Sequence, residues 1–244
     1  MLLDEPGDAA QNMAVDGALL ELATKPTLRI YGWQPHAVSL GYFQSIADFQ
    51  DLPADTVMVR RSTGGGAIHH GDELTFSLAL DAFRLPGDIS QSYVVLHDAI
   101  IRALAHVGVR CRRASGGAQP AARPSHRWCF RTPVDGDLVT DRGKLLGSAQ
   151  RRTNAGDGNR HARILHHGSL VLQRPNQTPF VAAVADQVPL TGELRRELHS
   201  ALATELARVL GLIARPGERS RAENAMATKL RSEQFGTTAY LHRR

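Results

Sequence analysis

Apolar and polar positions alternate along the chain with two different periods. Apolar residues recur at helical spacing in a segment that starts at Asn12, in residues 90–108 and in residues 191–211, where Thr191 is a natural N-cap. Residues 218–235 are also expected to be helical. Short apolar runs bounded by turn residues predict strands at 27–33, 37–43, 57–61, 74–80, 109–113 and 162–172, and two more in 137–152 around the turn Asp141-Arg142-Gly143.

The order of these elements indicates the fold class. Strands follow one another without intervening helices, which argues against a doubly wound parallel sheet. The chain is therefore expected to be α+β, with a mixed, largely antiparallel β-sheet and packed helices. Its 244 residues suit a single domain, 1–244, in which two segments of loop composition, 114–126 and 153–161, interrupt the second half.

Composition and charge narrow the classes of function. Two cysteines, Cys111 and Cys129, cannot form a disulfide framework, the N-terminus lacks a signal-peptide pattern, and no run approaches the ~20 apolar residues of a membrane helix. We therefore expect a cytoplasmic protein that does not enter membranes. The net charge of +5 comes from dispersed arginines, and aromatic residues make up only 5%. Nucleic-acid binding is thus the least favoured function, whereas an acidic protein partner or a phosphorylated ligand fits the charge.

The segment RRSTGGGAIHHGDELTFS, which begins at Arg60, is the first candidate for chemistry. Successive glycines let backbone N–H groups converge on a ligand oxygen, and Arg60 and Arg61 add positive charge beside Gly64, Gly65 and Gly66. The spacing matches neither a P-loop nor a dinucleotide-binding fingerprint. The alternative is an ordinary flexible hairpin turn.

Lys144 and Cys129 are two further candidates. A lysine on a strand beside small residues, as in GKLLGSAQRR, can place a point charge against a ligand oxygen, although most lysines are simply solvated. Cys129 would be a nucleophile if nearby cations, such as Arg127, Arg131 or Lys144, lower the pKa of its thiol. Otherwise it is a buried structural cysteine, which is the role expected for Cys111.

Two pairs of adjacent histidines occur, at 69–70 and at 166–167. Neighbouring residues on a strand point to opposite faces, so neither pair makes a metal site by itself. Because the sequence also lacks an HExxH or C-x-x-C motif, no metal ion is expected.

Taken together, five segments in the same order resemble the lipoate-protein ligase and octanoyltransferase family, whose fold is related to that of biotin protein ligase. These segments are NMAVDGALL, SLGYFQS, RRSTGGGAIHHGDELTFS, GKLLGSAQRR and HHGSLVL. The resemblance covers nearly the whole chain. It implies a biotin/lipoate protein ligase-like fold with one catalytic domain and no accessory C-terminal domain.

The resemblance also implies a site for an eight-carbon acyl chain. In that site Cys129 and Lys144 would be catalytic. The residues expected to bind the substrate are Arg61, Gly64, Gly65, Gly66, Ala67, Ile68, His69, Ser148, Ala149, His167 and Gly168.

The family that the chain resembles contains two chemistries. Transferases take octanoate from acyl carrier protein through a cysteine thioester and require no cofactor, whereas ligases activate free lipoate with ATP and Mg²⁺. Cys129 ahead of the Lys144 strand favours a transferase, while the triple glycine that ends at Gly66 looks more like the ligases.

We expect a monomeric octanoyltransferase. Its donor would be octanoyl-acyl carrier protein, and its acceptor a lysine on a lipoyl domain of a 2-oxoacid dehydrogenase subunit or of the glycine cleavage H protein. The alternatives are an ATP-dependent lipoate-protein ligase, in which Cys129 is structural, and a non-catalytic acyl- or biotin-like binding module.

Overall fold

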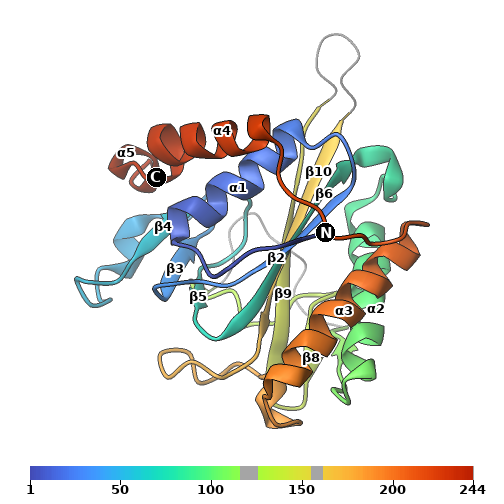
Figure 1. Ribbon diagram of the computed structural model, residues 1–244. Helices are drawn as coiled ribbons and strands as arrows, with labels where there is room; N and C mark the ends of the chain where they lie inside the picture. Colours follow the sequence, from blue (N-terminus) through green and yellow to red (C-terminus); the bar gives the residue numbers. More distant parts are fainter. Residues whose placement is uncertain (116–125, 155–161, 244) are drawn as a thin grey trace.

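The computed structural model describes residues 1–115, 126–154 and 162–243, and a large sheet runs through them (Figure 1). Its seven strands lie in the order β1-β2-β6-β10-β9-β8-β7. Neighbouring strands are antiparallel except for β1 and β2, which are parallel. The strands are β1 Leu2–Leu3, β2 Thr27–Tyr31, β6 Glu73–Asp81, β7 Arg112–Arg113, β8 Leu138–Thr140, β9 Gly143–Arg152 and β10 Arg163–Val171.

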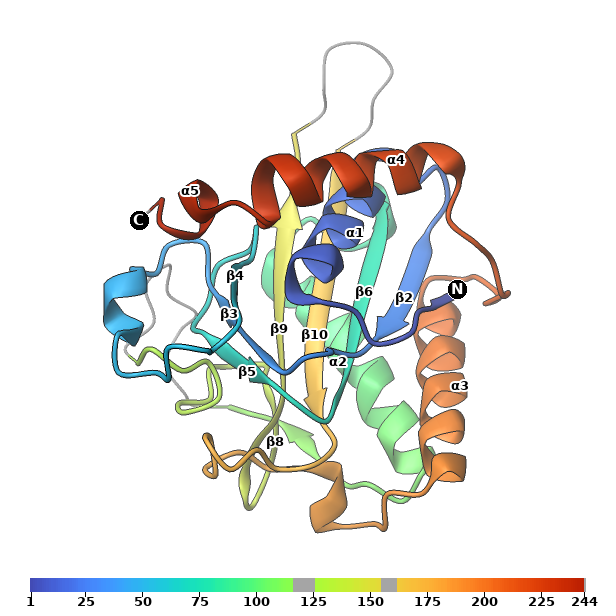
Figure 2. The ribbon, with the colours of Figure 1, turned by 60° about the vertical axis from the view of Figure 1, so that its left-hand side comes forward.

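A second, smaller sheet contains β3 Ala37–Leu40, β4 Met58–Arg60 and β5 Ile68–His70. The central strand β3 is parallel to β4 and antiparallel to β5. Figures 1 and 2 show this sheet to one side of the large sheet, near the start of helix α1. Met13 of α1, Trp33 and Val59 belong to one buried apolar cluster there, so the two sheets and α1 pack together.

Helices cover both faces of the large sheet (Figure 1). Helices α2 and α3 pack side by side on one face, whereas α1 and α4 lie together on the other. The helices are α1 Ala9–Leu22, α2 Ile89–His106, α3 Gly192–Val209, α4 Arg221–Leu230 and α5 Thr238–Leu241, with a π-helical turn Arg231–Phe235 and short 3-10 helices Ile46–Phe49, Ala82–Arg84 and Val184–Asp186.

Polar side chains cap the three long helices. The side chains of Asp8, Asp88 and Thr191 accept hydrogen bonds from the backbone N–H groups three residues further on. Each bond satisfies one donor that the first helical turn would otherwise leave without a partner. The cap predicted at Thr191 is therefore confirmed.

The two faces of strand β6 explain where the core ends and the site begins. Leu74, Phe76, Leu78 and Leu80 enter the large apolar core with α2 and α3. The alternate residues of the strand face α1, and Thr75 and Ser77 among them are polar and buried. Burying polar groups is costly unless they find partners, so this second face is where a functional site is expected.

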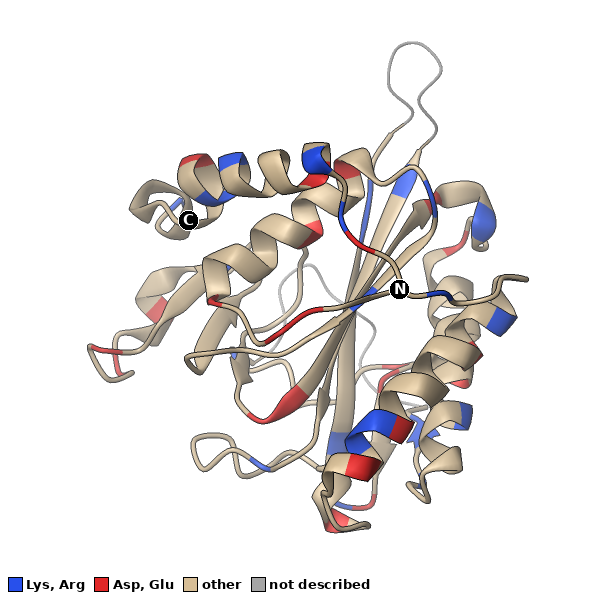
Figure 3. Cartoon of the chain, in the orientation of Figure 1, with Lys and Arg blue, Asp and Glu red and all other residues tan. Residues whose placement is uncertain are grey.

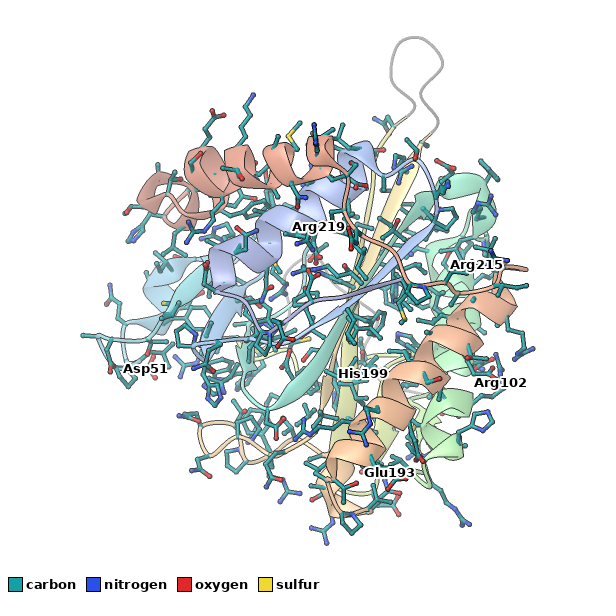
Figure 4. The ribbon with its side chains drawn as sticks, in the orientation of Figure 1. Asp51, Arg102, Glu193, His199, Arg215 and Arg219 are labelled. Atoms are coloured by element: carbon teal, nitrogen blue, oxygen red, sulfur yellow. The ribbon has the colours of Figure 1, made fainter. Side chains whose placement is uncertain are left out.

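Charged residues are spread over the outer surface. Figure 3 shows Lys and Arg interspersed with Asp and Glu. Figure 4 shows Arg102 on α2, and Glu193 and His199 on α3, in the outer helical layer. Arg102 Nε donates to Glu205 Oε2 at 2.7 Å, which ties α2 to α3.

Among the described residues, no helix combines the length and the apolar character needed to cross a membrane.

The predicted fold class is confirmed, and the differences are local. The strand expected at 109–113 is reduced to β7 Arg112–Arg113, because its partner β8 has only three residues to pair with. Strand β5, just after the glycine run, was not predicted. The last helical segment begins later than expected, at Arg221, where Ser220 caps it. The two predicted loops, 114–126 and 153–161, lie mostly outside the residues that the structure describes.

Candidate active site

A cavity lies between the α1 face of the large sheet and the small sheet, and the space inside it, with its opening to solvent included, is about 410 Å³. Its walls are formed by helix α1, by strands β2, β6, β9 and β10, by the glycine run and by Cys129. Its lining residues are Met13, Tyr31, Trp33, Arg61, Gly64, Gly65, Ile68, His70, Thr75, Cys129, Gly147, Ser148, Ala149, His167, Gly168 and Ser169.

The Arg61 side chain hydrogen-bonds to the backbone of the glycine run. Its Nη2 donates to the carbonyl oxygens of Gly64 and Gly66 at 3.0 and 2.8 Å. Its Nη1 donates to the backbone and side-chain oxygens of Ser39 at 2.7 and 2.9 Å. Burial lowers the pKa of Arg61 to about 10, so the guanidinium is still charged at neutral pH. Arg61 therefore fixes the loop conformation.

Two glycines are required by the geometry of this loop. Gly65 has a φ of +93°, a backbone conformation that side-chain-bearing residues rarely adopt. At Gly66 a Cβ atom would lie 2.7 Å from the backbone nitrogen of Cys129. The glycine run is thus a closely packed loop, and not a flexible turn.

The segment that carries Cys129 folds back over the glycine run. The N–H of Ala67 donates to the carbonyl of Arg127 at 2.7 Å, and the N–H of Cys129 donates to the carbonyl of Ala67 at 2.8 Å. These bonds form an isolated parallel bridge between Ala67 and Trp128. They bring a cysteine from a loop to the wall of the cavity.

Lys144 contacts the Cys129 thiol. Its Nζ lies 3.4 Å from Cys129 Sγ, 3.2 Å from the Cys129 carbonyl oxygen and 2.7 Å from Asp137 Oδ2. Lys144 and Asp137 are both buried. Burial alone would lower the pKa of Lys144, but the charges of Cys129 and Asp137 outweigh it and raise that pKa. Lys144 therefore places a positive charge directly beside the Cys129 sulfur.

Gly147 makes this arrangement possible. A Cβ atom there would lie 2.8 Å from Lys144 Cε, 3.1 Å from Lys144 Nζ and 3.4 Å from Cys129 Sγ. The lysine therefore reaches the thiol across a position with no side chain.

His167 lies at the cavity wall and is buried. Its Nε2 is 2.8 Å from Thr63 Oγ1, and its Nδ1 is 3.5 Å from Asp16 Oδ2. Asp16 in turn accepts hydrogen bonds from Arg29, Tyr31 and Ser77 at 2.7–2.9 Å. Burial would raise the pKa of Asp16, but His167, Arg29 and Ser77 lower it overall. The carboxylate is thus ionised and orients the imidazole.

A second network of polar side chains contacts Trp33. His70 stacks on its indole ring with centroids 3.7 Å apart, and His70 Nδ1 is 2.8 Å from Glu73 Oε1. Thr75 donates to the same carboxylate and accepts from Trp33 Nε1. Burial lowers the pKa of His70 despite Glu73. The network fixes one aromatic wall of the cavity.

The paired histidines separate as strand geometry requires. His70 lines the cavity described above, and His69 lines a second cavity with Ala67, Ile68 and Phe130. On β10, His167 lines the first cavity. His166 lies on the other side of the sheet, beside Tyr93 and His97.

Most of the predicted site residues come together. The first cavity is lined by Arg61, Gly64, Gly65, Ile68, Cys129, Ser148, Ala149, His167 and Gly168, and Lys144 touches the Cys129 thiol. Gly66 packs on the backbone of Cys129 instead. Ala67 and His69 lie at the second cavity. Cys111 is half-buried against the core, and burial raises its pKa to about 11, which fits its predicted structural role.

Several site residues were not recognised in the sequence: Asp137, Asp16, Trp33, Thr75 and Ser169. Asp137 directly precedes β8, the strand before the lysine strand, and pairing across that hairpin is a signal that points to it. The sheet register makes Thr75 and Ser169 neighbours, whereas Asp16 comes from helix α1 and Trp33 from the segment after β2. Within the described part of the chain, no group of three or more His, Cys, Asp or Glu residues is placed to hold a metal ion.

The chain is similar to known proteins over most of its length. Two proteins named Octanoyltransferase LipM, from Kyrpidia tusciae and Symbiobacterium thermophilum, are each 33% identical to this chain over 93% of its length. The match covers 94% of the Kyrpidia tusciae protein and 91% of the Symbiobacterium thermophilum protein. A solved bi-partite lipoate protein ligase, described with its E2 lipoyl domain from Thermoplasma acidophilum, has a TM-score of 0.72 at 21% identity, covering 99% of this chain and 94% of that one. Residues 8–212 match the family described as Lipoyl protein ligase A/B catalytic domain, and the chain therefore belongs to that family.

Proposed function

We propose that the chain transfers an octanoyl group from octanoyl-acyl carrier protein to a lysine of a lipoyl domain, through a thioester on Cys129. Its curated relatives are octanoyltransferases, so the chain is an octanoyltransferase of protein lipoylation. The single observation that carries the proposed mechanism is the 3.4 Å contact between Lys144 Nζ and Cys129 Sγ at the wall of the acyl cavity.

In the first half-reaction the Cys129 thiolate attacks the carbonyl carbon of the octanoyl thioester. A carbon–sulfur bond forms to Sγ, and the bond to the carrier sulfur breaks. The carrier leaves as a thiolate, which takes one proton and becomes the free thiol. The fixed charge of Lys144 stabilises the Cys129 thiolate before the attack and again when the thioester is broken.

In the second half-reaction the neutral ε-amine of the acceptor lysine attacks the octanoyl-Cys129 carbonyl. The carbon–nitrogen bond forms, the bond to Sγ breaks, and the amine loses one proton. Lys144 is a poor proton acceptor because its raised pKa keeps it protonated. Both ring nitrogens of His167 already have partners. We therefore assign the proton to the departing sulfur of Cys129.

The energetics and the charge of the chain support this route. Converting a thioester into an amide is downhill, so transfer requires no ATP and no metal ion. Acyl carrier proteins and lipoyl domains are expected to be acidic, and the net charge of +5 would raise their rates of association. The 2-oxoacid dehydrogenase subunits and the glycine cleavage H protein are the proposed sources of the lipoyl domain.

A comparison of two acyl donors tests the proposal. Wild type, Cys129→Ala and Cys111→Ala are each mixed with one lipoyl domain and either octanoyl-acyl carrier protein, or free lipoate with ATP and Mg²⁺. We expect carrier-dependent transfer by wild type and Cys111→Ala but none by Cys129→Ala. If wild type works only with lipoate and ATP, and Cys129→Ala does so equally well, the chain is an ATP-dependent ligase.

A further inference from the structure

One buried hydroxyl on the acyl cavity has no hydrogen-bond partner. Ser169 lies on β10, lines the cavity and is 2% exposed, and its Oγ has no partner among the described residues. A buried hydroxyl without a partner lowers stability. A cavity that keeps such a group has a donor available for a ligand.

The other hydroxyl groups that line this cavity are already in use. Tyr31 donates to Asp16, and Thr75 donates to Glu73. Ser148 Oγ lies 2.7 Å from His97 Nε2. Ser169 is therefore the one hydroxyl among the described lining residues that is open to a substrate atom.

The sheet register places Ser169 on the face of the sheet that the Cys129 thiol contacts. Ser169 of β10 is directly opposite Gly147 of β9, so the two positions share one face of the sheet with Cβ positions roughly 5 Å apart. A Cβ atom on Gly147 would lie 3.4 Å from Cys129 Sγ. The hydroxyl and the thiol thus line the same cavity from the same face of the sheet.

Acyl transfer at this thiol needs a donor that Lys144 does not supply. A lysine has three N–H groups. Those of Lys144 point to Asp137 Oδ2, to the Cys129 carbonyl oxygen and to Cys129 Sγ. The negative charge that develops on the acyl oxygen must then be met by other groups, since a preorganised donor there is worth much in rate.

We propose that Ser169 donates its hydroxyl hydrogen bond to the acyl oxygen in the tetrahedral states that form and break the Cys129 thioester. It acts there together with backbone N–H groups of the glycine run. The hydroxyl keeps its proton throughout, and no covalent bond forms at Ser169. This inference rests on the proposed function, because it concerns the acyl group bound to Cys129.

The test compares wild type, Ser169→Ala and Ser169→Thr in two reactions. The first is octanoyl transfer from octanoyl-acyl carrier protein, resolved into kcat and KM. The second is alkylation of Cys129 by iodoacetamide, which passes through no tetrahedral oxyanion. Cys111→Ala is the background for all three proteins, so that only Cys129 is alkylated.

For Ser169→Ala we expect kcat to fall about 100-fold, with KM within threefold and alkylation within twofold of wild type. Ser169→Thr, which keeps a hydroxyl, should recover at least a tenth of wild-type activity. The midpoint of thermal unfolding of Ser169→Ala should be unchanged or higher, because the lost hydroxyl has no partner in the free protein.

Two results would overturn the inference. If Ser169→Ala transfers octanoate within threefold of wild type, the hydroxyl has no part in catalysis. If transfer and alkylation fall by the same factor, Ser169 positions the thiol and does not bind the oxyanion. Failure of the proposed function is distinguishable, because wild type itself would then form no octanoyl-Cys129.

Discussion

Replacing Gly147 with alanine should slow catalysis about 100-fold while leaving the fold intact. The new Cβ would lie 2.8 Å from Lys144 Cε, whereas two carbon atoms in contact prefer roughly 3.5–4.0 Å. The end of the lysine side chain must therefore move by about 1 Å. Lys144 Nζ starts 3.4 Å from Cys129 Sγ, and such a shift breaks that contact.

The size of the effect follows from this displacement. Misplacing a catalytic group by about 1 Å costs on the order of 100-fold in rate. The atoms that must move are the far end of a flexible side chain, so we expect a loss of only about 1 kcal/mol in the free energy of unfolding. Activity and stability should thus separate.

The assay measures initial rates of octanoyl transfer to a lipoyl domain, together with thermal unfolding. Gly87→Ala is the matched control, because a Cβ there meets no atom within 4 Å, and it should behave as wild type. If Gly147→Ala keeps more than a third of wild-type activity, the Lys144 contact with the thiol is not what makes Cys129 reactive.

Three further outcomes are expected. Gly65→Val should lower the free energy of unfolding by about 1–2 kcal/mol in a denaturant titration, because a side chain is strained at a φ of +93°, and unchanged stability would contradict the loop geometry. Asp137→Asn removes one of the two anions that raise the pKa of Lys144, so the alkaline fall in the pH–rate profile should move to lower pH, and superimposable profiles would count against this ion pair. Burial lowers the pKa of His70, His97 and His166, so below about pH 6.5 the unfolded chain binds protons that the native chain does not. The free energy of unfolding should therefore fall by up to about 1.4 kcal/mol per pH unit for each of these histidines. Urea titrations that give the same stability between pH 7 and pH 5 would refute this.

Much of the fold follows from apolar periodicity. The three long helices and strands β2, β6, β8, β9 and β10 of the large sheet were predicted from their apolar patterns. Strands β1 and β5 were not predicted, and β7 is shorter than expected, since such short strands are defined by their pairing partners and not by their own residues.

The site was only partly predictable, for a related physical reason. Gly64, Gly65 and Lys144 lie in segments whose composition is unusual on its own. Asp137 and Ser169 look like ordinary polar residues in the sequence. Their roles depend on burial and on register, which place Asp137 against Lys144 and Ser169 opposite Gly147.

The adjacent histidines show what strand geometry can decide in advance. Their placement on opposite faces was predicted and is confirmed at both pairs. Which face would hold the cavity was not predictable, because it depends on where α1 and the small sheet pack.

The central claim is that an octanoyl group passes through Cys129. The most direct test incubates the protein with octanoyl-acyl carrier protein, in the absence of ATP and of any acceptor, and identifies the modified residue by mass spectrometry of the digested chain. The mechanism predicts one octanoyl group on the peptide that contains Cys129, none on the peptide that contains Cys111, and loss of the adduct when a lipoyl domain is added. An unmodified Cys129 under these conditions, with a lipoyl domain still octanoylated when both proteins are present, would contradict the thioester route.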